Sequence, residues 1–151
     1  MTLSLTVGTN TYISLADAES YVERLYGARR DAWDAAADAT KNALLAQATL
    51  DIDSLLWRGY KTDDTQALQF PRDGWEATDD EYTLVEQATV EQALHLLSYA
   101  SEARAAAQAQ GVQSVSVGGL SESYRAGGVP VLCQQAKRLL RQWMLLGAVI
   151  A

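Results

Sequence analysis

Cysteine and histidine are almost absent from the sequence. The single cysteine, Cys133, excludes an internal disulfide and fits a reducing compartment. The single histidine, His95, has no second histidine or cysteine near it in sequence, as a zinc site would need. A lone histidine inside a helix more often packs or caps than binds a metal, and no base lies near Cys133 to activate it as a nucleophile. We therefore expect no metal and interpret Cys133 as a small core residue.

Other arrangements that carry chemistry are also missing. Asp51 and Asp53 are two positions apart on an expected helix, so their carboxylates diverge and form no shared metal or acid–base site. Gly118-Gly119 lacks the lysine and the surrounding pattern of a phosphate-binding loop. The sequence therefore predicts no catalytic residues, no cofactor and no enzymatic activity.

Long apolar runs and excess positive charge are missing too. No stretch is long enough to cross a bilayer, and the first residues do not form a signal peptide, so we expect no membrane partner. The formal net charge of −7 argues against binding that depends on neutralising phosphates. The length of 151 residues predicts one domain.

Charge is unevenly distributed along the chain. Residues 1–122 hold all 19 acidic residues and eight Lys or Arg, a net charge of −11, whereas residues 123–151 hold four Lys or Arg and no acid. Such asymmetry predicts different partners for the two parts. It also suggests that the basic end of one copy lies near the acidic body of another.

Apolar residues at helical spacing predict a mainly α fold, a small bundle of about four helices with a long arm and one β-hairpin. Ser14 followed by Asp17 is typical of a helix N-terminus, and Gly27 of a helix end. Trp33, on a short helical segment, is expected to fill the core rather than to form a ligand platform. The expected elements are a strand at 2–7 and helices at 15–26, 31–37, 38 or 40 to 55, 81–110 and 131–146.

Residues 56–74 combine large side chains with glycine and proline between two of these helices. Pro71 favours an extended Phe70, and Asp73-Gly74 predicts a turn, so we expect an extended arm. Its side chains either fasten the arm to the core or stack on bases and contact the backbone of single-stranded DNA. The side chains concerned are Trp57, Arg58, Tyr60, Phe70, Pro71 and Arg72.

The C-terminal part predicts a hairpin and a helix, so the chain is divided into a core at 1–111, a hairpin at 112–126 and a docking helix at 130–147 within one domain, residues 1–151. A hairpin with a Gly-Gly turn is marginal alone and needs a helix or another chain's strand. Its candidate inter-subunit residues are Val115, Val117, Gly118, Gly119, Leu120 and Tyr124.

The final helix separates apolar from basic side chains at ~100° per residue. One interpretation is an ordinary surface helix with a solvated basic side. The other is a docking helix, with its apolar face on its own body or a partner and its basic face toward acidic protein or DNA. The candidate docking residues are Leu132, Leu139 and Trp143 on the apolar face and Lys137, Arg138 and Arg141 on the basic face.

Three stretches carry a resemblance to a known family. They are the Trp-Arg-Gly of residues 57–59 with the Gln-Phe-Pro-Arg of residues 69–72, the segment 11–18 followed by Tyr21, and the segment 115–124. In order and spacing they resemble the head–tail connector (adaptor or head-completion) proteins of tailed bacteriophages. Relatives of that family are often labelled DnaT-like single-stranded DNA-binding proteins.

The resemblance implies a structural virion protein. Such subunits form a ring, typically of twelve copies, in the neck between head and tail, where the ring joins the portal protein to a tail or stopper protein. Packaged DNA passes through the channel without specific binding, and the chain is made in the host cytoplasm during assembly. The alternatives are a DnaT-like module that binds single-stranded DNA and an unassigned interaction domain.

Overall fold

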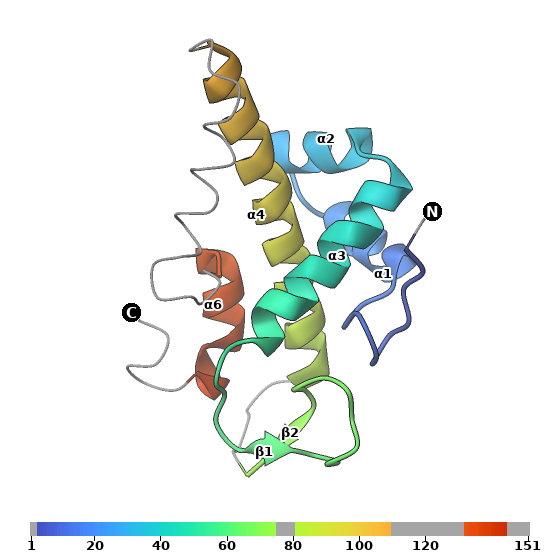
Figure 1. The fold of residues 1–151 in the computed structure, drawn as a ribbon, viewed down its shortest axis with the longest axis vertical. Coiled ribbons are helices and arrows are strands. Elements are labelled where there is room, and N and C mark those ends of the chain that lie inside the picture. The colour runs from blue at the N-terminus through green and yellow to red at the C-terminus, as the bar shows by residue number, and fades with distance from the viewer. Residues whose placement is uncertain (1–2, 75–80, 110–131, 145–151) are drawn as a thin grey trace.

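The computed structural model describes residues 3–74, 81–109 and 132–144 (Figure 1). This part of the chain is mainly helical, as the sequence predicts, with five α-helices, one 3-10 helix and a two-stranded antiparallel sheet between α3 and α4. The helices are α1 (Leu15–Val22), α2 (Ala28–Ala35), α3 (Asp38–Asp53), α4 (Glu81–Ala109), α6 (Gln134–Leu140) and the 3-10 helix η1 (Arg141–Trp143). The strands are β1 (Tyr60–Lys61) and β2 (Arg72–Asp73).

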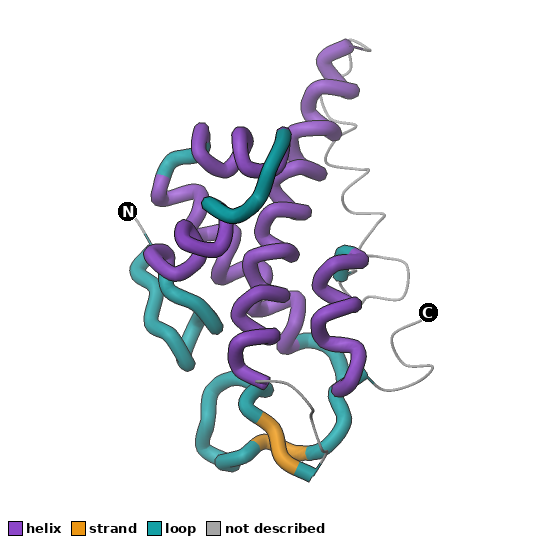
Figure 2. The backbone as a smooth tube through the Cα atoms, turned by 180° about the vertical axis from the view of Figure 1, so that it is seen from behind, coloured by secondary structure: helices purple, strands orange, loops and turns teal. Residues whose placement is uncertain are grey.

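Helix α4 is the element against which the other helices pack. Helix α3 crosses it, α6 lies on one side of its N-terminal half, and α1 and α2 lie on the other side (Figures 1 and 2). The C-terminal turns of α4 extend past the other labelled elements (Figure 1). The structure confirms the expected helix at 81–110 over its described residues, Glu81–Ala109.

Two clusters of buried side chains form the core, and both use α4. One cluster joins α1, α2 and α3 to α4, and Trp33 lies in it with no exposed surface, which confirms its expected place in the core. The other joins the arm and α6 to α4. Burying a large apolar side chain contributes about 1.5–3 kcal/mol, so α6 belongs to the folded body.

Helix α1 begins where the sequence predicts and ends earlier. The Ser14 hydroxyl accepts a hydrogen bond from the Asp17 main chain at 3.1 Å, as expected of an N-cap. The helix ends at Val22 rather than at residue 26. Gly27, predicted to stop α1, is instead the N-cap of α2 with φ of +103°, so α2 starts at residue 28 rather than 31.

The predicted N-terminal strand at 2–7 is wrong for the described residues. Residues 3–6 lie in no strand, and Val7 makes only an isolated bridge with Thr11 across a turn. The last helix is also shorter than predicted, since α6 gives way to the 3-10 helix at Arg141. The predicted hairpin at 112–126 lies outside the described residues.

The arm is not the extended segment that the sequence suggests. It folds back on itself, and β1 pairs with β2 in an antiparallel register that places Tyr60 opposite Asp73 and Lys61 opposite Arg72. The Phe70–Pro71 peptide bond on the returning side is cis. The arm is thus a closed loop, with base and tip, at the end of the molecule away from the C-terminal turns of α4 (Figure 1).

Candidate interaction surfaces

The side chain of Arg72 closes the base of the arm. It is 9% exposed, and its guanidinium donates hydrogen bonds to the main-chain oxygens of Trp57, Arg58 and Gly59, which directly precede β1. It also donates to the main-chain and side-chain oxygens of Gln69 on the returning side. A planar group with five N–H donors can join both sides at once. Arg72 is therefore committed to the fold and does not face a ligand.

Gly59 is required where the two sides of the arm approach each other. Its φ is +76°, and a Cβ at this position would lie 2.0 Å from the main-chain oxygen of Asp73. No side chain fits at that distance. The glycine that the sequence shows as a break in the arm is thus the point of closest contact between its two sides.

Aromatic rings from three parts of the chain meet around Phe70. Its ring centroid lies 6.1 Å from Tyr12, 5.3 Å from Trp57 and 5.6 Å from Trp143, each in an edge-to-face arrangement. All four side chains are buried. The structure therefore places Trp57 and Phe70 where they fasten the arm to the core, and their faces cannot stack on bases.

Tyr12 connects this cluster to the C-terminal end of α3. Its hydroxyl donates to the Asp53 carboxylate and accepts a hydrogen bond from the Phe70 main chain at 3.3 Å. Burial, with the neighbouring Asp53 charge, raises the pKa of Tyr12 above its ordinary value, and burial raises that of Asp53. The main chain of Gln69 also donates to Asp53. This network holds the returning side of the arm.

A second polar network joins α3, α4 and the start of α6. The buried amide of Gln92 donates to Asp51 at 3.0 Å and accepts from the main chain of Cys133 at 2.9 Å. Gln47 also donates to Asp51, whose pKa is raised by burial. Asp51 and Asp53 thus have separate hydrogen-bond partners. Ionised Asp51 accepts hydrogen bonds only, which orients the Gln92 amide toward α6.

Helix α6 shows the division of faces that the sequence predicts. Leu132, Ala136, Leu140 and Trp143 are buried against this chain's own body, and Leu139 is half-buried. The apolar candidate docking residues Leu132 and Trp143 therefore contact the core of their own chain. The basic candidates remain on the outside, where Arg138 and Arg141 are exposed and Lys137 is half-buried.

The rest of the arm's surface is mainly polar. Tyr60 is 64% exposed and Pro71 is exposed, whereas Arg58 is half-buried and donates its main-chain N–H to the oxygen of Trp143 at 2.7 Å. The tip carries Asp63 and Asp64, both exposed. Of the six arm candidates, only Tyr60 and Pro71 therefore lie on the surface.

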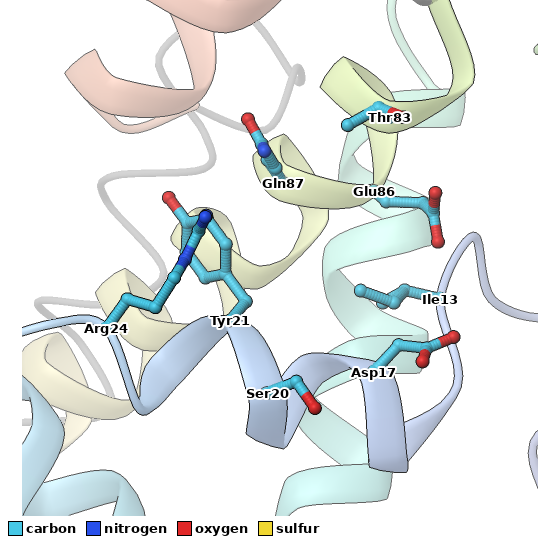
Figure 3. Close-up of a pocket in the computed structure, with 8 residues that line it drawn as sticks. All are labelled: Ile13, Asp17, Ser20, Tyr21, Arg24, Thr83, Glu86 and Gln87. Atoms are coloured by element: carbon cyan, nitrogen blue, oxygen red, sulfur yellow. The ribbon is translucent and has the colours of Figure 1, made fainter.

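A groove of about 300 Å³ lies between α1 and α4 (Figure 3). Arg24 covers one face of the Tyr21 ring with its guanidinium 5.4 Å from the ring centroid, and Tyr21 donates to buried Glu91 at 2.6 Å. The pKa of Tyr21 is raised by burial and by that hydrogen bond. The lining residues are Ile13, Asp17, Ser20, Tyr21, Arg24, Thr83, Glu86 and Gln87. Mixed charges and an open shape give this groove no recognisable chemistry.

Potential metal ligands do not gather in the described part of the chain. It contains no group of three or more His, Cys, Asp or Glu side chains that could hold a metal ion. His95 is exposed beside Tyr99, and Cys133 is buried, which raises the pKa of its thiol. Among the described residues, no helix is both long and apolar enough to cross a membrane.

Comparison with known proteins gives a family. A family model described as "Putative DnaT-like ssDNA binding protein" matches residues 2–149. The chain belongs to this family. No curated protein and no solved structure matches it. This family description agrees with the DnaT-like label that relatives of the resembling family carry. It supports the single-stranded DNA interpretation better than the connector interpretation. The comparison gives no support for a connector.

The structure buries the arm side chains that we expected to contact single-stranded DNA if the family description applies to the arm. Trp57, Phe70 and Arg72, the side chains best suited to stacking and phosphate contact, are buried. The hairpin candidates at 115–124 lie outside the described residues.

Sequence reasoning missed several buried or half-buried polar residues that join the helices. Glu19 on α1 accepts from Trp33 at 3.0 Å and from Lys41 at 2.7 Å, which ties α1 to α2 and α3. Glu91 on α4 pairs with Arg29 on α2. A usable signal was present for Glu91 and Gln92, since they lie between Val90 and Ala93-Leu94 on α4. Their partners could not be read from the sequence because they lie far away along the chain.

Proposed function

We propose that this protein is a structural subunit of a virion, a head–tail connector whose copies form a ring that joins a portal protein to a tail or stopper protein. The observation that carries the proposal is the burial of Trp57, Phe70 and Arg72, which close the arm and fasten it to the core instead of facing a ligand. The resemblance of three sequence stretches to connectors supports the same function. The protein then acts through the shape and charge of its surfaces.

The charge of the chain suits this role. A net charge of −7 disfavours adhesion to DNA, so a ring of such subunits gives a channel that DNA passes through without sticking. A ring assembled head to tail needs two different complementary surfaces on each copy. The exposed cations of α6 and the acidic remainder of the chain provide opposite charges for that purpose.

The test is assembly with the portal protein encoded by the same genome. Purified protein and portal are mixed, and the mass of the complex is measured by native mass spectrometry. We expect a complex that contains several copies of this chain per portal ring. A portal ring that gains no mass at any concentration of the chain contradicts the proposal.

The second candidate is binding of single-stranded DNA, which the family description favours. In the described part, the groups that could serve it are exposed Tyr60 and the cations Lys137, Arg138 and Arg141. A fluorescent oligonucleotide titrated with protein at several salt concentrations tests it. Affinity that falls steeply with salt supports this candidate, and no binding at low salt rejects it.

A further inference from the structure

The outer face of α6 is a cationic surface held in a fixed position. Lys137 and Arg138 of α6 and Arg141 at the start of η1 lie opposite the side that packs on α4, and we call this surface the basic face of α6; residues 132–144 contain no acid. The ion pairs of the described residues join Arg29 to Glu91, Arg30 to Asp34 and Lys41 to Glu19, so none of them uses these three cations. Hydrogen bonds from Cys133 to Gln92 and from Arg58 to Trp143 fasten both ends of the segment. The positive charge is thus presented on a segment that is hydrogen-bonded to α4 at one end and to the arm at the other.

The tip of the arm is an acidic surface that is equally well ordered. Asp63 accepts hydrogen bonds from the main chain and the hydroxyl of Thr65, which lower the pKa of its carboxyl and keep it charged. The Gln66 side chain crosses the loop, accepting from the main chain of Asp63 and donating to the main-chain oxygen of Pro71. Lys61 donates to the main-chain oxygen of Gln66. Asp64 stands exposed beside this framework.

The loop that carries the acidic tip and helix α6 lie on opposite sides of the end of the molecule that holds the arm (Figures 1 and 2). In Figure 1 the loop at residues 62–69 leaves β1 on the side away from α6, and the reverse view in Figure 2 shows the same separation. They are therefore not placed to meet within one copy. Two different complementary patches on opposite sides of one subunit are what a head-to-tail contact requires, and repetition of that contact closes a ring when the rotation allows.

We propose that the basic face of α6 in one copy contacts the acidic tip of the arm in the next, with Arg138 and Arg141 facing Asp64 and Asp63. The partner of this surface is a second copy of the chain, and the inference rests on the proposed ring-forming function. Opposite charges at the solvent-exposed edge of an interface determine the orientation and the rate of association more than the final affinity. The contact therefore weakens as salt rises.

Mutations that reverse the charge on one surface, on the other, or on both test the contact. Self-association of the full chain, alone and on the portal ring, is measured by native mass spectrometry for the wild type, Asp64→Lys, Arg138→Glu and the combined variant. Asp64 is chosen because Asp63 organises the loop through Thr65. Each single reversal is expected to weaken association about tenfold at low salt, and the combined variant to recover most of the loss, because the pair is restored with its charges exchanged.

A matched control separates this pair from the general effect of charge. Glu23→Lys changes the net charge as Asp64→Lys does, at an exposed position at the end of α1, and is expected to leave association unchanged. Equal weakening by Glu23→Lys, or no recovery in the combined variant, overturns the inference. So does the absence of self-association by the wild type both alone and on the portal ring.

Two further outcomes distinguish the inference from the proposed function. A wild-type chain that assembles on the portal, with Asp64→Lys assembling equally well, rejects the contact and keeps the connector function. A wild-type chain that ignores the portal but binds single-stranded DNA, with binding lost in Arg138→Glu, rejects both. In that case the cationic face of α6 holds DNA instead of a second copy.

Discussion

Replacing Arg72 with alanine tests whether one side chain holds the arm closed. Five hydrogen bonds join its guanidinium to Trp57, Arg58, Gly59 and Gln69. Alanine removes all of them and leaves their acceptors without this donor. Because the same arm supplies Trp57 and Phe70 to the aromatic cluster, loosening its base also loosens the packing of α6.

The size of the effect follows from opposing contributions. Hydrogen bonds from a charged donor contribute about 1.5 kcal/mol or more each, and the 3.4 Å bond to Trp57 adds little, so the favourable sum is about 6 kcal/mol. That sum is already net of the bonds that these groups make to water, so the opposing contribution is the ordering of the arginine side chain, which costs about 2 kcal/mol. We therefore expect Arg72→Ala to lower the free energy of unfolding by about 4 kcal/mol and Tm by about 8–16 °C.

Urea unfolding followed by tryptophan fluorescence measures this loss. Arg72→Lys is expected to recover little of it, because a single ammonium cannot reach both sides of the arm. Arg30→Ala is the control, since Arg30 is partly exposed and its ion pair with Asp34 spans 3.5 Å, and it is expected to cost less than about 0.5 kcal/mol. A loss for Arg72→Ala as small as that of the control, or full recovery by lysine, refutes the reasoning.

Three further predictions concern the arm and the buried polar groups. Gly59→Ala should cost at least about 2 kcal/mol more than Gly8→Ala in urea unfolding, because both have positive φ but only Gly59 meets a main-chain oxygen, at 2.0 Å; equal losses contradict this. Trp57→Phe should cost about 1 kcal/mol more than Trp143→Phe, because the Trp57 indole donates to a main-chain oxygen whereas that of Trp143 is buried without a hydrogen-bond partner among the described residues; the reverse order contradicts it. Burial raises the pKa of Asp51, so the wild type should gain stability relative to Asp51→Asn as pH falls from about 7 to about 4, and a relative loss over that range contradicts the assignment.

Local sequence signals were sufficient for most helices. The predicted starts of α1 and α4 agree with the structure, since a capping serine and an acidic first turn act within a few residues. The early end of α6 could not be predicted in this way. There the main-chain oxygen of Trp143 accepts a hydrogen bond from the main chain of Arg58, and Met144 forms a β-bridge with Trp57. These main-chain contacts with the arm replace the hydrogen bonds that would continue the helix.

The same contrast applies to the candidate residues. The spacing of apolar and basic side chains was enough to predict the two faces of α6, because which residues share a helix face depends only on helix geometry. Whether the arm's aromatics and arginine face a ligand or the core depended on α4, α6 and Tyr12, which meet them only in the folded chain. The sequence by itself therefore determined the helical class, the scarcity of catalytic groups and the unequal charge. Only the tertiary structure decided that the arm folds back and that its large side chains are buried, because those outcomes depend on contacts between residues distant along the chain.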